Sequence, residues 1–209
     1  MGRLPTKFIK LIMRNYFKKY DNRDRWMSYW QQIESVLSLE PKKVLEIGIG
    51  NKTVTNYLRE HGVEVVTLDI NENLKPDIVA SVEKMTLPDE SFDVVLAAEI
   101  LEHLPFEKFE TCLKEIKRVT KKYAVISLPH WGWTFYLIFK APLLKKIQFL
   151  FKISGVLKHK FNGEHFWEIG KKCYPLSKIK KEIERAGFRI LKDFITPDSP
   201  YHHFFVLEK

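Results

Sequence analysis

A glycine turn between an apolar segment and a helix-like segment constrains the fold of this chain more than any other feature. Residues 44–53 read Val-Leu-Glu-Ile-Gly-Ile-Gly-Asn-Lys-Thr, and Asp69 follows Gly48 by twenty-one residues. Gly48 and Gly50 permit backbone angles and close approaches that a Cβ atom would block, so a ligand can lie against the free N–H groups of the helix start. An acid placed like Asp69 can accept hydrogen bonds from two ribose hydroxyls. The pattern predicts a nucleoside-containing cofactor without identifying it.

Segments with strand and helix patterns alternate after residue 42. We expect strands over 43–47, 63–69, 77–82, 92–98, 123–128, 188–195 and 202–207, and helices over 53–61, 106–120 and 176–186. This alternation predicts a parallel sheet with helices on both faces. Because only a short turn joins the last two strands, we expect them to pair antiparallel.

A helical segment over 6–40 precedes the first strand. Its second part has apolar residues at spacings of three and four, which predicts that they share one helix face: Trp26, Tyr29, Trp30, Ile33, Val36 and Leu37. We expect this face to pack on the core.

The 209 residues fit a single domain. We divide it into an N-terminal helical segment (1–41), a cofactor-binding half (42–129), a substrate lid insert (130–172) and a C-terminal helix with a strand pair (173–209).

Positive charge is concentrated outside the cofactor-binding half. The net charge is +9, and residues 1–25 and 140–172 each carry eight basic residues against two acids. These segments favour an anionic partner, either a phosphate-bearing small molecule, a lipid surface or nucleic acid, unless they are merely a solvated surface. Cys112 and Cys173 form no paired motif and no signal peptide is evident, so we expect a cytoplasmic location, with possible peripheral attachment to the membrane.

Two further motifs distinguish between cofactors. Thr53 occupies the position of the third small residue of a dinucleotide-binding turn, which disfavours a dinucleotide. Residues 87–95 read Leu-Pro-Asp-Glu-Ser-Phe-Asp-Val-Val and residues 99–104 read Glu-Ile-Leu-Glu-His-Leu. With these motifs, residues 43–130 resemble the class I S-adenosylmethionine-dependent methyltransferases. The resemblance implies an α/β fold with one Rossmann-like, seven-stranded, mostly parallel sheet and an antiparallel last strand.

The resemblance also implies S-adenosyl-L-methionine as methyl donor, S-adenosylhomocysteine as product and a set of binding residues. Glu46, Gly48 and Gly50 match positions at the methionine portion, with Asn51 in the turn. Asp69 matches the ribose-binding acid, and Ile70 and the pair Ser81 and Val82 match adenine positions. Ala98 and Glu99 would lie beside the sulfonium through main-chain groups. Ser81 stands where relatives have Asp, and Lys52 replaces a frequent small residue.

Several absences narrow the chemistry. No Asn/Asp-Pro-Pro-Tyr/Phe motif follows residues 92–98, so the resemblance disfavours methylation of planar amide or adenine nitrogens. No Pro-Cys nucleophile is present for covalent C5 methylation of pyrimidines. The pair His202 and His203 has no Cys or acid at ligand spacing, so we expect no metal site.

The insert over 130–172 is expected to determine substrate recognition. Its residues Leu143, Leu144, Ile147, Leu150 and Phe151 have helical spacing and are interrupted by lysines. They predict a basic amphipathic helix, which is either a lid packed over the active site or, over 133–157, a membrane-surface helix. The apolar run is too short to span a bilayer. A large, hydrophobic pocket roof is expected in either case.

Two histidines of the insert are candidate general bases. His130 ends the strand over 123–128, and His165 lies in the loop after Asn162; imidazole titrates near neutrality, although either residue could instead serve a structural hydrogen bond. His103 is expected to cap or orient its turn, with a catalytic role as the alternative.

The sequence favours a methyltransferase acting on an apolar or lipid-linked small molecule, with O-methylation favoured because of these histidines. Alternatives are an RNA or protein methyltransferase that uses the basic segments, although nucleic acid is disfavoured, and a non-catalytic cofactor-binding or membrane-associated scaffold.

Overall fold

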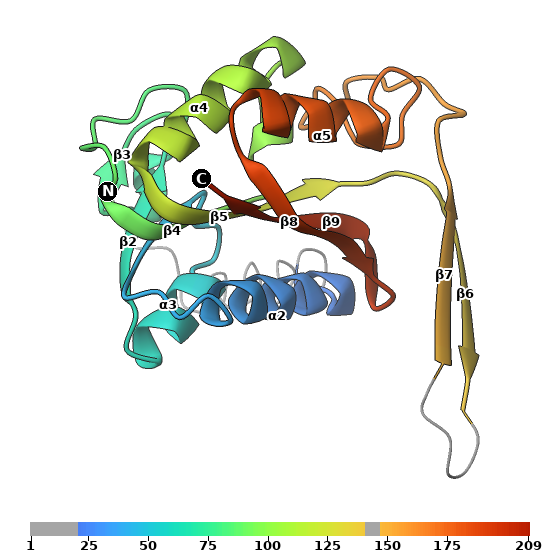
Figure 1. Ribbon diagram of the computed structural model, residues 1–209, viewed down its shortest axis with the longest axis horizontal. Coiled ribbons are helices and arrows are strands. Elements are labelled where there is room, and N and C mark those ends of the chain that lie inside the picture. The colour runs from blue at the N-terminus through green and yellow to red at the C-terminus, as the bar shows by residue number, and fades with distance from the viewer. Residues whose placement is uncertain (1–20, 141–146) are drawn as a thin grey trace, which may run out of the picture.

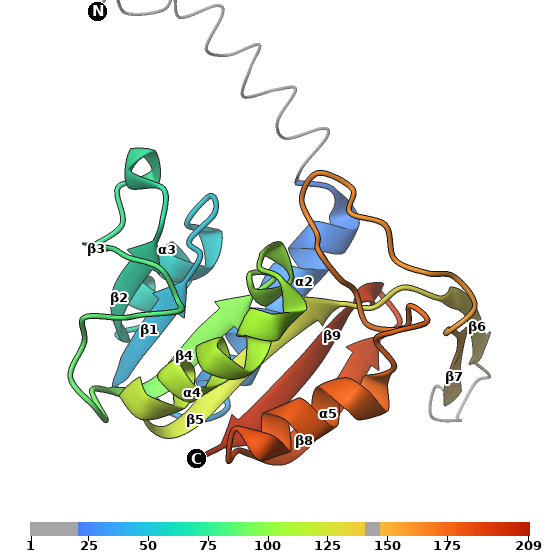
Figure 2. The same cartoon turned by 90° about the horizontal axis from the view of Figure 1, so that it is seen from above.

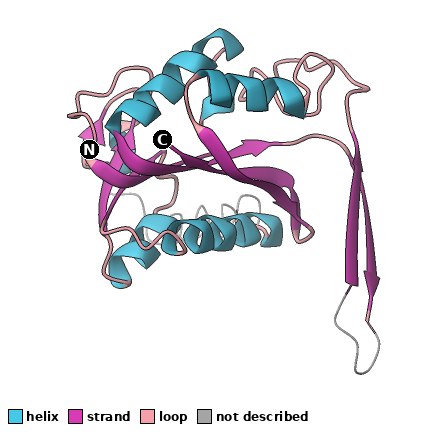
Figure 3. Ribbon diagram, in the orientation of Figure 1, coloured by secondary structure: helices cyan, strands magenta, loops and turns pink. Residues whose placement is uncertain are grey.

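The computed structural model describes residues 21–140 and 147–209. It contains a seven-stranded sheet between two layers of helices, with a separate hairpin beside them (Figures 1 and 3). The sheet strands are β1 (Lys43–Ile47), β2 (Glu64–Asp69), β3 (Ile78–Val79), β4 (Phe92–Ala98), β5 (Thr120–Pro129), β8 (Arg189–Thr196) and β9 (Ser199–Glu208). The helices are α2 (Arg23–Leu37), α3 (Thr53–Glu60), α4 (Phe109–Val119) and α5 (Leu176–Arg185), with short 3-10 turns η1 (Glu72–Leu74), η2 (Leu101–His103) and η3 (Phe106–Lys108).

The strand order is β3-β2-β1-β4-β5-β9-β8. The pairs β1–β2, β1–β4, β2–β3 and β4–β5 are parallel, whereas β9 is antiparallel to both β5 and β8. The predicted mostly parallel sheet with an antiparallel last strand is therefore confirmed. The central strands β1 and β4 are almost entirely buried, as strands covered on both faces must be.

One helix pair covers each face of the sheet: α4 and α5 lie on one side, and α2 and α3 on the other (Figure 1). Helix α4 packs on the sheet through an apolar stripe at spacings of three and four, formed by Phe109, Cys112, Leu113, Ile116 and Val119. No helix within the described ranges is both long and apolar enough to cross a bilayer.

The predicted apolar face of α2 is only partly correct. Tyr29, Ile33 and Val36 are buried against the sheet, but Trp26 and Trp30 are about half exposed, at 47% and 55%. These two rings lie at the edge of the stripe, where the helix surface turns towards solvent. The preceding part of the predicted helical segment lies outside the described residues.

The insert forms a β-hairpin, so the predicted amphipathic helix is wrong. Strands β6 (Trp133–Phe139) and β7 (Ile147–Ile153) pair antiparallel; Leu143 and Leu144 lie outside the described residues. A short apolar run satisfies helix and strand periods alike, and here the strand period prevails. The hairpin stands apart from the sheet and both helix layers (Figures 1 and 2). The alternative of a lid packed on the domain does not hold for these strands.

Candidate functional site

A cleft of about 180 Å³ opens at the carboxyl ends of β1, β2 and β4, where ligands bind in open α/β sheets. Helix α2 forms its other wall. It is lined by Arg25, Tyr29, Gln32, Glu46, Gly48, Ile49, Gly50, Asn51, Val54, Asp69, Leu74, Ala98, Glu99, Ile100 and His103. The cleft thus contains seven of the residues that the sequence predicted for the cofactor: Glu46, Gly48, Gly50, Asn51, Asp69, Ala98 and Glu99.

The two predicted glycines have different structural roles. Gly48 has φ +78°, and a Cβ atom there would lie 1.9 Å from Cδ1 of Ile100. Gly48 therefore allows the segment after β4 to approach the turn. Gly50 has φ +46°, and a Cβ atom there would meet nothing within 4 Å. Asn51 Oδ1 accepts from the backbone N–H of Thr53 at 3.0 Å, so it stabilises the start of α3.

Asp69 connects the end of β2 to the glycine turn. Its Oδ2 accepts from the N–H of Ile49 at 3.1 Å, and its Oδ1 accepts from the N–H of Asn71 at 2.8 Å. Each carboxylate oxygen has two lone pairs, so both retain the capacity to accept from a hydroxyl. The pair of oxygens fits a ribose diol.

Glu46 is a buried carboxyl group in the wall of the cleft. Thr55 Oγ1 donates to Glu46 Oε2 at 2.5 Å, and the side chain is 5% exposed. Burial raises the pKa of Glu46 to about 7, against the opposing effects of the Thr55 hydrogen bond and the Arg59 charge. A ligand ammonium group would stabilise the charged form of this carboxyl group.

Helix α2 contributes a wall that the sequence analysis missed. Arg25, Tyr29 and Gln32 line the cleft, and Tyr29 donates through its hydroxyl to Asp21 Oδ1 at 3.1 Å. Asn51 Nδ2 donates to the same oxygen at 3.0 Å, which joins the helix to the turn. The detectable signal was the polar pair Arg25 and Gln32, which have helical spacing and lie beside the apolar stripe that contains Tyr29.

Three predicted cofactor residues do not line the cleft. Ile70 is 75% exposed, Ser81 accepts through Oγ from the N–H of Glu83, and Val82 is buried in the core. Leu74, in the turn η1, supplies an apolar side chain at this end of the cleft. The adenine roles of Ile70, Ser81 and Val82 stay predictions.

His130, one of the two predicted bases, lies in the protein interior. Its Nδ1 is 2.9 Å from Nδ1 of His203, and Lys152 donates to its carbonyl oxygen at 2.6 Å. Burial, with the nearby Lys152 and His203, lowers the pKa of His130 to about 3. His130 is not among the residues that line the cleft, so its role as general base stays a prediction.

Glu99 follows β4 directly and faces the cleft. Its backbone is strained, with φ +55°, and Ser127 Oγ donates to its Oε1 at 2.9 Å. Burial is the main cause that raises the pKa of Glu99 to about 7. The strained turn brings Glu99 to the wall of the cleft next to Ala98, and their place beside the sulfonium stays a prediction.

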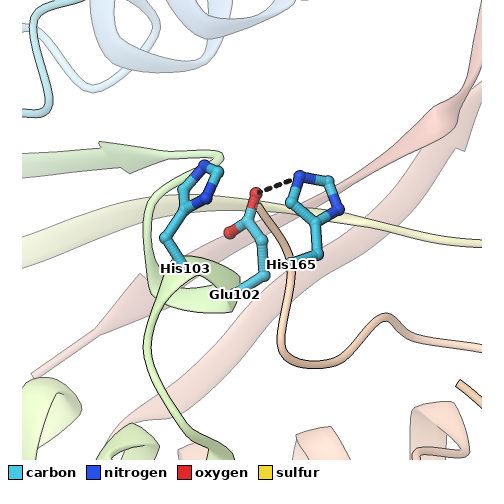
Figure 4. A group of neighbouring side chains, drawn as sticks. All are labelled: Glu102, His103 and His165. Carbon is cyan, nitrogen blue, oxygen red and sulfur yellow. Dashed lines mark ion pairs between the residues drawn. The ribbon is translucent and has the colours of Figure 1, made fainter. Parts of the chain in front are cut away.

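The second predicted base, His165, lies beside η2 in a group with Glu102 and His103 (Figure 4). The loop after residue 160 brings it there, and the N–H of Phe166 donates to the carbonyl oxygen of Glu102 at 2.9 Å. His165 Nε2 lies 4.0 Å from Glu102 Oε1. Glu102 was not among the predicted site residues; the available signal was two acids and a histidine within residues 99–103.

The structure also places acids beside the histidine pair that seemed to lack them. His202 Nε2 lies 3.9 Å from Glu99 Oε2, and His203 Nε2 lies 3.7 Å from Asp193 Oδ1. Strand pairing brings these residues together across the sheet, which spacing along the chain did not reveal.

Comparison with known proteins matches residues 45–128 to a family described as the methyltransferase domain. The fold is similar to a SAM dependent methyltransferase from Archaeoglobus fulgidus, with a TM-score of 0.63 and 17% identity over 94% of this chain and 99% of that chain. It is also similar to 1,6-didemethyltoxoflavin-N1-methyltransferase from Burkholderia thailandensis, solved with 1,6-didemethyltoxoflavin and S-adenosylhomocysteine. That structure gives a TM-score of 0.60 and 14% identity over 100% of this chain and 92% of the other. No curated protein matches the chain.

Proposed function

We propose, from the match of residues 45–128 to the methyltransferase-domain family, that the chain is a class I S-adenosylmethionine-dependent methyltransferase and that it methylates a hydroxyl group of an apolar or lipid-linked small molecule. The family uses S-adenosylmethionine as methyl donor, and the similar toxoflavin enzyme was crystallised with S-adenosylhomocysteine. The observation that carries the proposal is the cleft in which the glycine turn, Asp69 and Glu46 converge.

The cofactor lies in this cleft in the proposed arrangement. Asp69 binds the ribose hydroxyls, and the glycine turn receives the methionine portion. Glu46 binds the amino group, and Arg25 of α2 binds the carboxylate because a guanidinium pairs well with that group. The two charges of the methionine tail thus meet opposite charges in the wall.

The reaction is an in-line displacement at the end of β4. The bound cofactor supplies a methyl group on a positively charged sulfur: the O–CH₃ bond forms as the S–CH₃ bond breaks, the bonding pair stays on sulfur and the hydroxyl proton passes to solvent. The protein contributes chiefly by aligning the acceptor and excluding water. Ala98 and Glu99 border the methyl group in this arrangement, and the acceptor hydroxyl lies near His103 and His165.

The β6–β7 hairpin supports an apolar acceptor and contact with a lipid surface. Cross-strand partners alternate in register so that one face of the hairpin is wholly apolar: Trp133, Phe135, Leu137 and Phe139 pair with Ile153, Phe151, Phe149 and Ile147. All eight side chains are 38–63% exposed. An isolated two-stranded hairpin is marginal in water, so this face is suited to a partner that covers it.

Lysines near this face favour an anionic lipid surface as the partner. Lys140 is exposed at the end of β6, and the connecting segment carries Lys145 and Lys146. Basic residues beside aromatic and aliphatic ones match the lipid interface, where cations meet headgroups and rings enter the acyl boundary. A lipid-linked acceptor would then be taken from the membrane surface.

Methyl transfer from labelled S-adenosylmethionine tests the proposal. The purified chain is incubated separately with a lipid extract, a water-soluble metabolite fraction and total RNA. We expect base-resistant label in the lipid extract, and none with the variant Asp69→Asn. Label mainly in RNA would overturn the acceptor class in favour of the RNA alternative. Cofactor binding without transfer to any fraction would favour the non-catalytic scaffold.

A further inference from the structure

We propose that Glu102, His103 and His165 form a binding site for one divalent transition-metal ion at the rim of the cofactor cleft (Figure 4). Each of the three side chains offers a ligand atom, and these atoms all lie within 4.8 Å of one another. Ligands of one ion at bond lengths of about 2.1 Å are roughly 3–4 Å apart, so a small closure brings the group to coordination distance. His103 and His165 approach edge to face, with ring centroids 5.0 Å apart.

The environment of Glu102 indicates that this group is a ligand-binding site and not ordinary side-chain packing. The side chain is 0% exposed, and neither carboxylate oxygen has a hydrogen-bond partner within the described part of the chain. Buried polar atoms are almost always satisfied, and an unpaired buried carboxylate is especially costly. A bound cation between the two imidazoles would supply the missing partner.

The tautomers of both histidines leave a nitrogen available for a metal. Nδ1 of His103 lies 3.0 Å from the carbonyl oxygen of Glu164, which can only accept, so this nitrogen carries the proton. Nδ1 of His165 lies 3.1 Å from Glu168 Oε1 and donates in the same way. With Nδ1 protonated, Nε2 is the nitrogen through which each ring would bind a metal. Metal-binding histidines typically donate their other N–H to a carbonyl or carboxylate group in this manner.

The surrounding loop holds these groups in place. Asn162 Oδ1 accepts from the N–H of His165 at 2.7 Å, and Tyr201 donates through its hydroxyl to Glu168 Oε1 at 3.0 Å. Trp167 is fully buried and donates through Nε1 to the carbonyl oxygen of Leu104 at 3.1 Å. A fixed loop is what a preorganised metal site requires.

The donor set indicates the class of metal. Two imidazole nitrogens and one carboxylate suit Mn²⁺, Fe²⁺, Co²⁺ or Zn²⁺, whereas Mg²⁺ and Ca²⁺ prefer all-oxygen sites. Three protein ligands leave coordination positions open to water or substrate. The exposed side chain of His103 gives the ion a route from solvent.

His103 also lines the cleft beside Glu99, so the proposed ion would lie at the edge of the cofactor cleft. An ion there would bind the acceptor hydroxyl oxygen, lower its pKa and hold it towards the methyl group. His165 is then a ligand and not a free base. This catalytic role rests on the proposed function, whereas metal binding itself does not.

Metal titration of the full chain tests the site. The protein is treated with EDTA, dialysed, and titrated with Co²⁺ and Mn²⁺, with the visible spectrum of Co²⁺ and calorimetry as readouts. We expect one ion per chain, and an affinity at least about 10-fold lower in His165→Ala, Glu102→Gln and His103→Ala. His103→Ala changes an exposed side chain, so it keeps the test valid if the buried Glu102 variant fails to fold.

A matched control comes from the same loop. Glu164 is exposed and accepts from His103 through its carbonyl oxygen, which the substitution keeps, so Glu164→Gln should bind the ion like the wild type. The site would be overturned if the wild type bound no metal at millimolar concentration, which is the result expected if Glu102 keeps a proton instead. Equal binding by the wild type and all three variants would overturn it as well. S-adenosylhomocysteine binding is measured on the same samples, so failure of the metal site is separated from failure of the methyltransferase proposal.

Discussion

Gly48 shows how one residue connects the cofactor turn to the rest of the active site. A Cβ atom at this position would overlap the side chain of Ile100, which follows β4 and precedes η2. The conformation is also left-handed, which only glycine adopts without strain. A side chain here would therefore displace the segment that carries Glu99 and His103.

We expect Gly48→Ala to lower the free energy of unfolding by about 2–4 kcal/mol, through overpacking and backbone strain together. Gly50→Ala is the matched control, because a Cβ atom there meets nothing within 4 Å. It should cost only about 1 kcal/mol, for the positive φ alone. Urea unfolding measures both. Equal losses in the two variants would contradict the role of the Ile100 contact.

At the level of single residues, local sequence patterns predicted part of the candidate site. Glycines and an acid after a strand have few alternative roles, so Gly48, Gly50 and Asp69 could be identified without coordinates, and all three line the cleft. His130 could not be judged in this way, because its neighbour His203 belongs to a strand more than seventy residues later. The Glu102 group depends on the loop after residue 160, whose path no local pattern predicts.

Among the elements, the hairpin is the least expected. Strands β1 and β4 match their predicted ranges, because turn residues and apolar composition delimit each run. The hairpin was misread because its apolar residues fit two periods. Lys152 anchors its base by donating to the carbonyl oxygens of His130 and Pro200 at 2.6 and 2.5 Å. No described part of the chain covers the apolar face of the hairpin.

We expect the double variant Phe135→Ser and Phe151→Ser to reduce co-flotation with anionic vesicles by at least about tenfold, since two large apolar side chains would no longer enter the lipid interface. These residues face each other across the hairpin, with ring centroids 6.5 Å apart. Ile138→Ser, on the opposite face of β6, is the control and should float like the wild type. Unchanged flotation of the double variant would rule out this face as the lipid contact.

Over the whole molecule, buried histidines make the free energy of unfolding depend on pH. Burial, against a weaker opposing effect of Asp193, lowers the pKa of His203 to about 4. His203 therefore takes up its proton near pH 6.5 in the unfolded chain but only near pH 4 in the folded chain. His203 contributes stability that is present above pH 6.5 and is lost as the pH falls towards 4.

We expect His203→Asn to lose less stability than the wild type between pH 7 and pH 5, by about 2 kcal/mol. Because the asparagine amide does not titrate, the pH-dependent contribution of residue 203 to the free energy of unfolding is lost in the variant. The difference between the two pH values shows this loss whatever the variant's stability at pH 7. Urea unfolding at both pH values gives the difference. A drop as large as that of the wild type would show that His203 is not held neutral in the folded chain.

The glycine turn and Asp69 line the cleft, the loop after residue 160 brings His165 beside His103, and the β6–β7 hairpin stands apart from the sheet (Figure 2). The central claim is that the cleft at β1, β2 and β4 binds the methyl donor. Calorimetric titration with S-adenosylhomocysteine tests it most directly.

We predict that the wild type binds S-adenosylhomocysteine at one site per chain with micromolar affinity or better. In Asp69→Asn the affinity should be at least about tenfold weaker, because the carboxylate that accepts two hydroxyl hydrogen bonds is lost. Glu72→Gln removes an equal charge from an exposed side chain a few residues away and should bind normally. No binding to the wild type, or equal binding by wild type and Asp69→Asn, would contradict this prediction.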